Sequence, residues 1–110
     1  MRWSRCRSIS KEDDVPVVEL IIALTASEGR MEELRDALQI LRKAGIQDPG
    51  CLDYRIAQGS LSENRFFLLG RWTDEGALFR HEHTQDFLEG VARVRTCCEF
   101  VDFQPINWLE

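Results

Sequence analysis

The chain has 110 residues, of which 14 are Lys or Arg and 19 are Asp or Glu, so its formal net charge is -5 at pH 7. This length predicts one domain with a modest core, which association with a second copy would help to stabilise. The acidic balance argues against nucleic acid or an anionic membrane as a partner, because both attract clustered Lys and Arg. We therefore expect a small globular protein with no nucleic-acid and no membrane partner.

Residues 1–14 are expected to form a polar, poorly ordered extension, followed by a single domain at residues 15–110. The extension lacks the apolar core of a signal peptide and the length of a transmembrane helix. The four cysteines have neither metal-site nor redox spacing, and two histidines are too few for a usual metal site. We expect free thiols, no metal and a cytoplasmic location.

Four strands are predicted from alternating or continuous apolar runs, at about residues 15–25, 51–58, 65–72 and 97–104. Three helices are predicted from apolar residues at the three-and-four spacing, at about residues 28–45, 74–81 and 84–94. Ser27 is expected to cap the first helix, Gly45 to close it, and Pro105 to end the last strand. The order strand, helix, strand, strand, helix, strand predicts a ferredoxin-like α+β fold with an antiparallel sheet.

Both faces of this sheet are apolar, although the helices can cover only one of them. The residues expected on the uncovered face are Val17, Ile21, Ala23, Phe67, Leu69, Val101 and Phe103. A patch of this size is larger than soluble monomers usually leave exposed. We therefore expect a homodimer in which two sheets pack face to face.

Candidate chemistry is confined to a few side chains, because no nucleotide-binding, metalloprotease or hydrolase motif is present and we expect no cofactor. Trp72 ends the third strand, either as a core residue or as a wall against which a planar substrate stacks. His81 shares a helix face with Leu78 and so faces the sheet. It is either a half-buried histidine bonded to backbone or a general base for a phenol, enol or quinol. Tyr54 could reach the same pocket from a neighbouring strand.

Three segments resemble landmarks of the antibiotic biosynthesis monooxygenase family, in the same order and over roughly residues 15–103. They are Glu28-Gly29-Arg30, the segment Asp48-Pro49-Gly50-Cys51-Leu52-Asp53-Tyr54, and residues 65–87 with Trp72, Ala77, Leu78, His81 and Phe87. The resemblance implies a homodimeric α+β barrel that oxidises an electron-rich phenol, quinol or polycyclic aromatic with dioxygen and without a cofactor. It implies catalytic roles for His81 and Trp72. The expected substrate-binding residues are Tyr54, Phe66, Leu68, Leu78 and Phe87.

Two alternatives stay open at this point. In a non-catalytic small-molecule-binding or stress-response dimer, Trp72 and His81 only line a ligand pocket or fill the core. The second is a haem-degrading relative, but such relatives carry an Asn at the start of the first strand together with a ligating His, and the lack of an Asn in residues 15–23 counts against haem. A closed apolar core beneath Trp72 would favour the non-catalytic interpretation.

Overall fold

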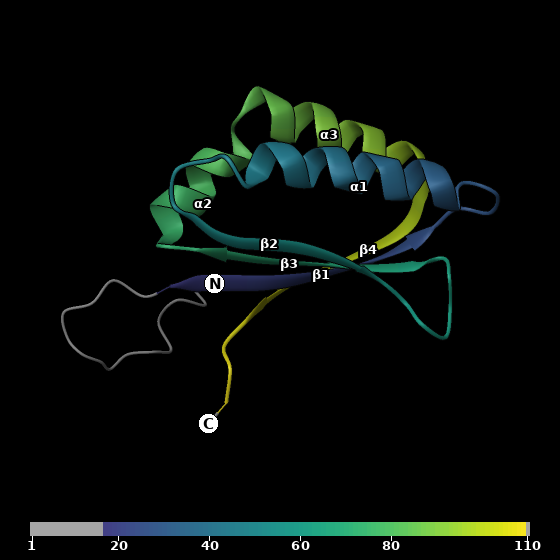
Figure 1. Ribbon diagram of the computed structural model, residues 1–110, viewed down its shortest axis with the longest axis horizontal. Helices are drawn as coiled ribbons and strands as arrows, with labels where there is room; N and C mark the ends of the chain where they lie inside the picture. Colours follow the sequence, from purple (N-terminus) through teal and green to yellow (C-terminus); the bar gives the residue numbers. More distant parts are fainter. Residues whose placement is uncertain (1–16, 110) are drawn as a thin grey trace.

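The computed structural model describes residues 17–109, and within them the chain forms four strands and three helices. The strands are β1 (Val18–Ala26), β2 (Cys51–Gln58), β3 (Arg65–Trp72) and β4 (Cys98–Ile106). The helices are α1 (Met31–Gly45), α2 (Glu75–Glu82) and α3 (Gln85–Thr96). The strands form one antiparallel sheet in the order β2-β3-β1-β4, and the helices lie on one side of it (Figure 1). The predicted ferredoxin-like α+β fold is confirmed; the extension predicted at 1–14 lies outside the described residues.

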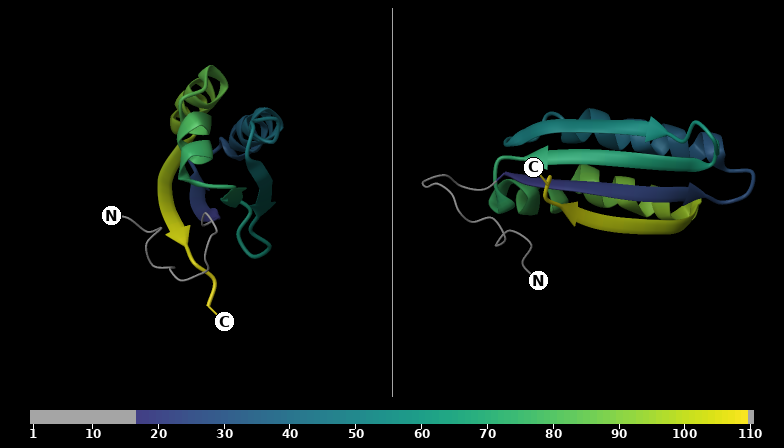
Figure 2. Two further views of the ribbon diagram at one scale, coloured as in Figure 1. Left: turned by 90° about the vertical axis from the view of Figure 1, so that its left-hand side faces the viewer. Right: turned by 90° about the horizontal axis from the view of Figure 1, so that it is seen from below.

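The helices cover one face of the sheet and leave the other uncovered. Helix α1 buries the stripe Leu34, Leu38 and Leu41 against that face, as its apolar spacing predicts. Figure 2 shows α1 and α3 side by side over the strands, and its right-hand view shows the opposite face with no helix in front of it. None of the helices in the described part is long and apolar enough to cross a membrane.

Two predicted element boundaries are wrong. Arg30, not Ser27, is the residue that precedes α1, and no side chain caps this end of the helix. The Ser27 carbonyl instead accepts a hydrogen bond from the Arg30 N–H at 2.9 Å, in a turn where Gly29 has φ +77°. Pro105 does not end β4, which continues to Ile106. Because β4 is an edge strand, it tolerates a residue that cannot donate a backbone hydrogen bond.

The prediction for Val101 and Phe103 is also wrong. Val101 lies opposite Leu24 in the register of β1 and β4, and Phe103 lies opposite Ile22. Directly opposed residues of antiparallel strands point to the same face, and Leu24 is buried under the helices. Val101 and Phe103 therefore face the helices. Alternation shows that residues two apart share a face, but it does not show which face that is.

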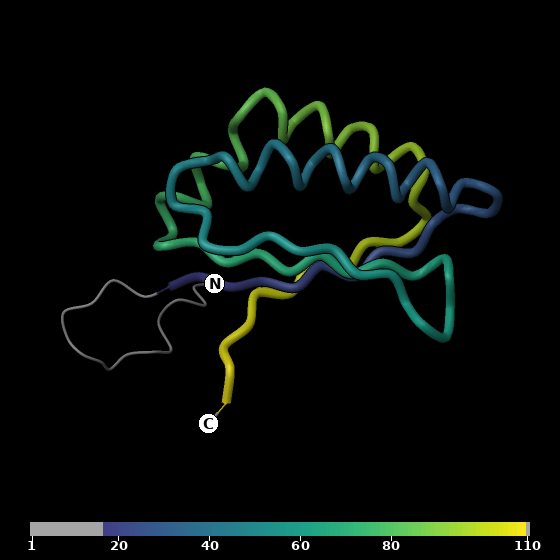
Figure 3. Tube along the Cα trace, viewed as in Figure 1, coloured from purple at the N-terminus to yellow at the C-terminus, as the bar shows by residue number. Residues whose placement is uncertain are grey.

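The turn after α1 positions the part of the molecule that carries the candidate chemistry. Gly50 has φ +88°, and its carbonyl accepts a hydrogen bond from the Thr73 N–H at 2.9 Å. This bond ties the turn at residues 46–50 to the junction between β3 and α2. Figure 3 shows the trace passing from the end of α1 close to α2 before it enters β2. Asp48, in the middle of this turn, is thereby held next to α2.

Candidate functional site

A pocket of about 550 Å³ lies between the sheet and the helices. Its walls are mostly aliphatic and aromatic, and every strand except β2 contributes at least two side chains. The predicted site residues that line it are Tyr54, Leu68, Trp72, Leu78, His81 and Phe87. Phe66 does not line the pocket: it is 1% exposed and packs in the core, so its predicted role in substrate binding is corrected. The core beneath Trp72 is therefore not closed.

His81 is held by a carboxylate rather than by the backbone. Its Nδ1 lies 2.7 Å from Oδ2 of Asp48, and the residue is 5% exposed, so the alternative of a half-buried histidine bonded to backbone does not hold. A carboxylate accepts hydrogen bonds, so the network assigns the proton to Nδ1. In the neutral imidazole, the Nε2 of His81 then carries a lone pair, and it has no partner among residues 17–109. An imidazole in this tautomer can take a proton from a bound ligand.

Two helix caps fix the position of His81. Asp74 precedes α2 and caps it, because its carboxylate accepts the Ala77 N–H at 2.8 Å. Thr84 precedes α3 and caps it in the same way, and it also donates its hydroxyl to the His81 carbonyl at 2.9 Å. The backbone around His81 is thus held on both sides, and the ring has little freedom to leave Asp48.

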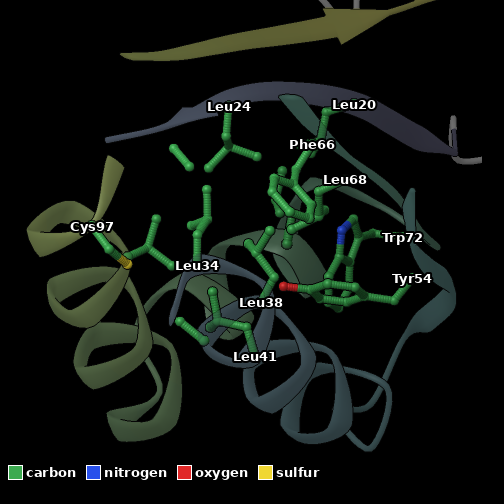
Figure 4. Close-up of a cluster of buried hydrophobic side chains, with 14 of the residues drawn as sticks. Leu20, Leu24, Leu34, Leu38, Leu41, Tyr54, Phe66, Leu68, Trp72 and Cys97 are labelled. Atoms are coloured by element: carbon green, nitrogen blue, oxygen red, sulfur yellow. The ribbon is translucent and has the colours of Figure 1, made fainter. Parts of the chain in front are cut away.

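Aromatic rings surround the imidazole. The ring centroid of His81 is 4.3 Å from that of Trp72, 4.8 Å from Phe87 and 5.7 Å from Tyr54. Figure 4 shows Tyr54 and Trp72 together at one end of the buried cluster. Gly45 makes room for this arrangement, because a Cβ there would overlap the Tyr54 ring and come within 3.2 Å of the His81 ring. The site therefore requires a glycine at the last position of α1.

Two further polar groups in the pocket have no hydrogen-bond partner within the described part of the chain. Tyr54 uses its backbone N–H and carbonyl in hydrogen bonds, but its hydroxyl has no acceptor within the described ranges. Burial raises the pKa of Tyr54, because the charged phenolate is poorly solvated there, so the hydroxyl stays protonated and can donate. The indole N–H of Trp72 lies close to Gly70, and likewise no hydrogen-bond acceptor is found for it in residues 17–109. Both donors are available to a ligand.

The sequence model of the family described as antibiotic biosynthesis monooxygenase matches residues 17–93. This range covers most of the chain and includes the Asp48 turn, Tyr54, Trp72, His81 and Phe87. The chain belongs to the antibiotic biosynthesis monooxygenase family. The resemblance seen in the sequence is thus confirmed. None of the curated proteins matches the chain in sequence.

Solved structures agree with this fold. A Pseudomonas aeruginosa protein, PA3566, is 28% identical over 86% of this chain and 95% of its own, with a TM-score of 0.80. SnoaB, a cofactor-independent oxygenase from Streptomyces nogalater, is 16% identical over 86% and 94%, with a TM-score of 0.77. A conserved Methanosarcina mazei protein is 19% identical over 82% and 90%, with a TM-score of 0.77. At these sequence identities, the similarity to SnoaB and to the Methanosarcina mazei protein shows a shared fold alone.

Three charged residues of the site were not predicted from the sequence. Asp48 pairs with His81, and Glu82 and Arg95 line the pocket. Burial raises the pKa of Glu82, while the neighbouring His81 and His83 oppose that shift more weakly. The contact of Asp48 with His81 spans 33 positions, so no local pattern could indicate it. The sequence could have indicated Arg95, because Phe87, Val91 and Arg95 follow one another at intervals of four residues and so share one face of α3.

The remaining histidine and the cysteines lie away from this chemistry. His83 is exposed, and its Nδ1 is 2.8 Å from the Phe79 carbonyl. Cys51, Cys97 and Cys98 are free thiols, and Cys6 lies outside the described residues. Burial raises the pKa of the Cys51 and Cys97 thiols, which favours their unreactive protonated form. Within residues 17–109, no three His, Cys, Asp or Glu side chains gather as a metal site would require.

Proposed function

We propose that this protein is a cofactor-independent monooxygenase that oxidises a phenol, a quinol or a polycyclic aromatic with dioxygen. The pairing of His81 with Asp48 inside an apolar pocket carries the proposal, because it leaves a basic Nε2 facing a space that can hold a flat substrate. Membership of the family and a fold shared with SnoaB, a cofactor-independent oxygenase, support it. The expected cytoplasmic location is part of the same proposal.

The first step is removal of a proton. The Nε2 of His81 takes the hydroxyl proton of the phenol, and Asp48 stabilises the imidazolium that results. The Tyr54 hydroxyl and the Trp72 N–H can donate hydrogen bonds to the phenolate oxygen or to the oxygen species that follows. The apolar walls exclude water from the ionised substrate. An electron-rich phenolate then supplies the electrons that dioxygen needs.

The remaining steps use dioxygen as the oxidant and need no added reductant. The phenolate passes one electron to dioxygen, and the aryloxyl radical and superoxide combine to form a C–O bond at a ring carbon. The imidazolium returns its proton to the outer peroxide oxygen. His81 then removes the C–H proton at the same carbon, the O–O bond breaks, a C=O bond forms, and the departing hydroxide takes the proton. One phenol and one dioxygen thus give one quinone and one water.

Oxygen consumption tests this proposal. The purified protein should consume oxygen with hydroquinones or anthrone-like phenols when no flavin or metal is added. His81→Ala should lower kcat by about 100-fold or more, the usual scale of general-base catalysis. The loss should shrink as the pH approaches the pKa of the free phenol, because an ionised substrate no longer needs the base. His83→Ala is the matched control and should keep full activity, since His83 is exposed and bonded to the Phe79 carbonyl.

Each contrary outcome has a distinct meaning. Full activity of His81→Ala across the pH range would show that His81 is not the base. If the phenols bind in the pocket but none is oxidised, a non-catalytic small-molecule-binding protein replaces the enzyme.

A further inference from the structure

Arg95 is a cation on an otherwise apolar stripe of α3. Phe87, Val91 and Arg95 follow one another at intervals of four residues, so they lie on one helix face, and all three line the pocket. Arg95 is itself exposed, and the β4 residues that line the pocket, Val101 and Phe103, are 48% and 46% exposed. Arg95 therefore stands where the pocket meets solvent, between α3 and β4.

Among residues 17–109, the guanidinium of Arg95 has no anion to pair with. Within the described part of the chain it forms neither a salt bridge nor a hydrogen bond, whereas Arg30, Arg55 and Arg71 each pair with a carboxylate. Among the described residues, the carboxylate that lines the pocket belongs to Glu82, which precedes α3. Glu82 and Arg95 thus lie at opposite ends of this helix.

Helix geometry sets the distance between Arg95 and the proposed base. The Phe87 ring contacts the His81 ring at a centroid distance of 4.8 Å. Arg95 follows Phe87 by eight residues, which is about 12 Å along the axis of an α-helix. The pocket between these points is lined by apolar side chains of α3 and β4. A ligand that reaches both ends is therefore long, apolar in its middle and different at its two ends.

We propose that the substrate carries a carboxylate at the end remote from the oxidised hydroxyl, and that Arg95 binds this carboxylate. The inference deepens the proposed function and rests on it for the identity of the reacting end. A guanidinium presents parallel N–H donors that match the two oxygens of a carboxylate, which gives orientation as well as affinity. Binding at Arg95 would place the hydroxyl of a rigid polycyclic acid at His81.

Arg93 provides a matched control. It lies in the same last turn of α3, where a cation of either residue interacts favourably with the helix dipole. Arg93, however, lines a separate groove between α1 and α3, together with Ala37 and Asp86, on the side away from the sheet. Arg95→Gln and Arg93→Gln therefore change the net charge and the helix end equally, and only the first changes the pocket.

The test is calorimetric titration of the full chain with anthracene-2-carboxylate and with its neutral isostere anthracene-2-carboxamide. The wild-type protein should bind the carboxylate about tenfold more tightly than the amide at low ionic strength, and added salt should reduce the difference. Arg95→Gln should weaken only the carboxylate, so that the two affinities become equal. Arg93→Gln should keep the preference.

Several results would overturn the proposal. These are equal affinity of the wild-type protein for the two compounds, equal losses in both variants, and no binding of either compound. Because binding is measured without turnover, the result is independent of whether any phenol is oxidised. If the carboxylate preference depends on Arg95 but the protein oxidises no phenol, the monooxygenase proposal is wrong and the carboxylate-binding role of Arg95 still holds.

Discussion

The two faces of the sheet are both apolar, but they differ in which groups are left without partners. On the helix-covered face, the unpaired groups are hydrogen-bonding atoms inside a pocket: the Tyr54 hydroxyl, the Trp72 N–H and the His81 Nε2. On the outer face, Glu19 and its neighbours pair with one another, and among residues 17–109 the buried polar side-chain atom left without a partner is the Arg65 Nε. Glu19 binds Arg71 at 3.0 Å and accepts the Trp108 indole N–H at 2.6 Å. The inner face thus offers specific hydrogen bonds to a small ligand, whereas the outer face offers apolar area.

The outer face suits a second copy of the chain. Its apolar centre is formed by Ile21, Ala23, Phe67 and Leu69 from β1 and β3. The Arg65 side chain lies over the Phe67 ring, and its Nε is buried without a partner in residues 17–109. A facing sheet would cover the apolar centre and could supply an acceptor to Arg65. We therefore propose that the homodimer expected from the sequence forms through this face.

The largest effect is expected from a charge at the centre of the outer face. Phe67→Asp should raise the dissociation constant of the dimer by about 100-fold or more, because an unpaired charge in a dry interface is costly. Leu61→Asp, in the exposed loop between β2 and β3, is the control and should leave the dimer intact. Sedimentation velocity at micromolar concentration measures both. A monomeric wild-type protein would rule out this use of the outer face.

A smaller effect is expected on the inner face, from Gly45→Ala. The new Cβ would overlap the Tyr54 ring, and overpacking of this kind costs about 1–3 kcal/mol, of which the better helix propensity of Ala recovers up to about 1 kcal/mol. Thermal unfolding should therefore occur at a lower temperature. Gly76→Ala, at an exposed position of α2, should leave stability unchanged or increase it slightly. Equal effects of the two changes would mean that Tyr54 is free to move away from Gly45.

The contrast between the faces also shows what could be predicted from sequence. The order of elements was correct, because local apolar spacing and turn residues determine it. The placement of Val101 and Phe103 was not, because Phe100 on the opposite face is equally apolar and alternation alone could not choose between them. The rings of Trp72 and His81 were placed in one pocket correctly. The contacts that give His81 its chemistry depend on tertiary folding, so they could be read only from the structure.

The smallest of these effects is expected from Asp48→Asn, which keeps the shape of the turn and removes the carboxylate that fixes the tautomer of His81. The amide oxygen can accept a hydrogen bond from Nδ1–H, or the amide NH2 can donate one to an unprotonated Nδ1. The second arrangement places the imidazole proton on Nε2, where it blocks base catalysis. We expect kcat to fall about tenfold while KM changes little. Nitrogen chemical shifts of the imidazole distinguish a positioning role from a structural one, because they report which nitrogen carries the proton. The wild-type protein should show the proton on Nδ1, and Asp48→Asn should show a mixture of the two tautomers. Unchanged chemical shifts and unchanged kcat in the variant would mean that the aromatic rings around His81, and not Asp48, determine the tautomer and orientation of the imidazole in the pocket.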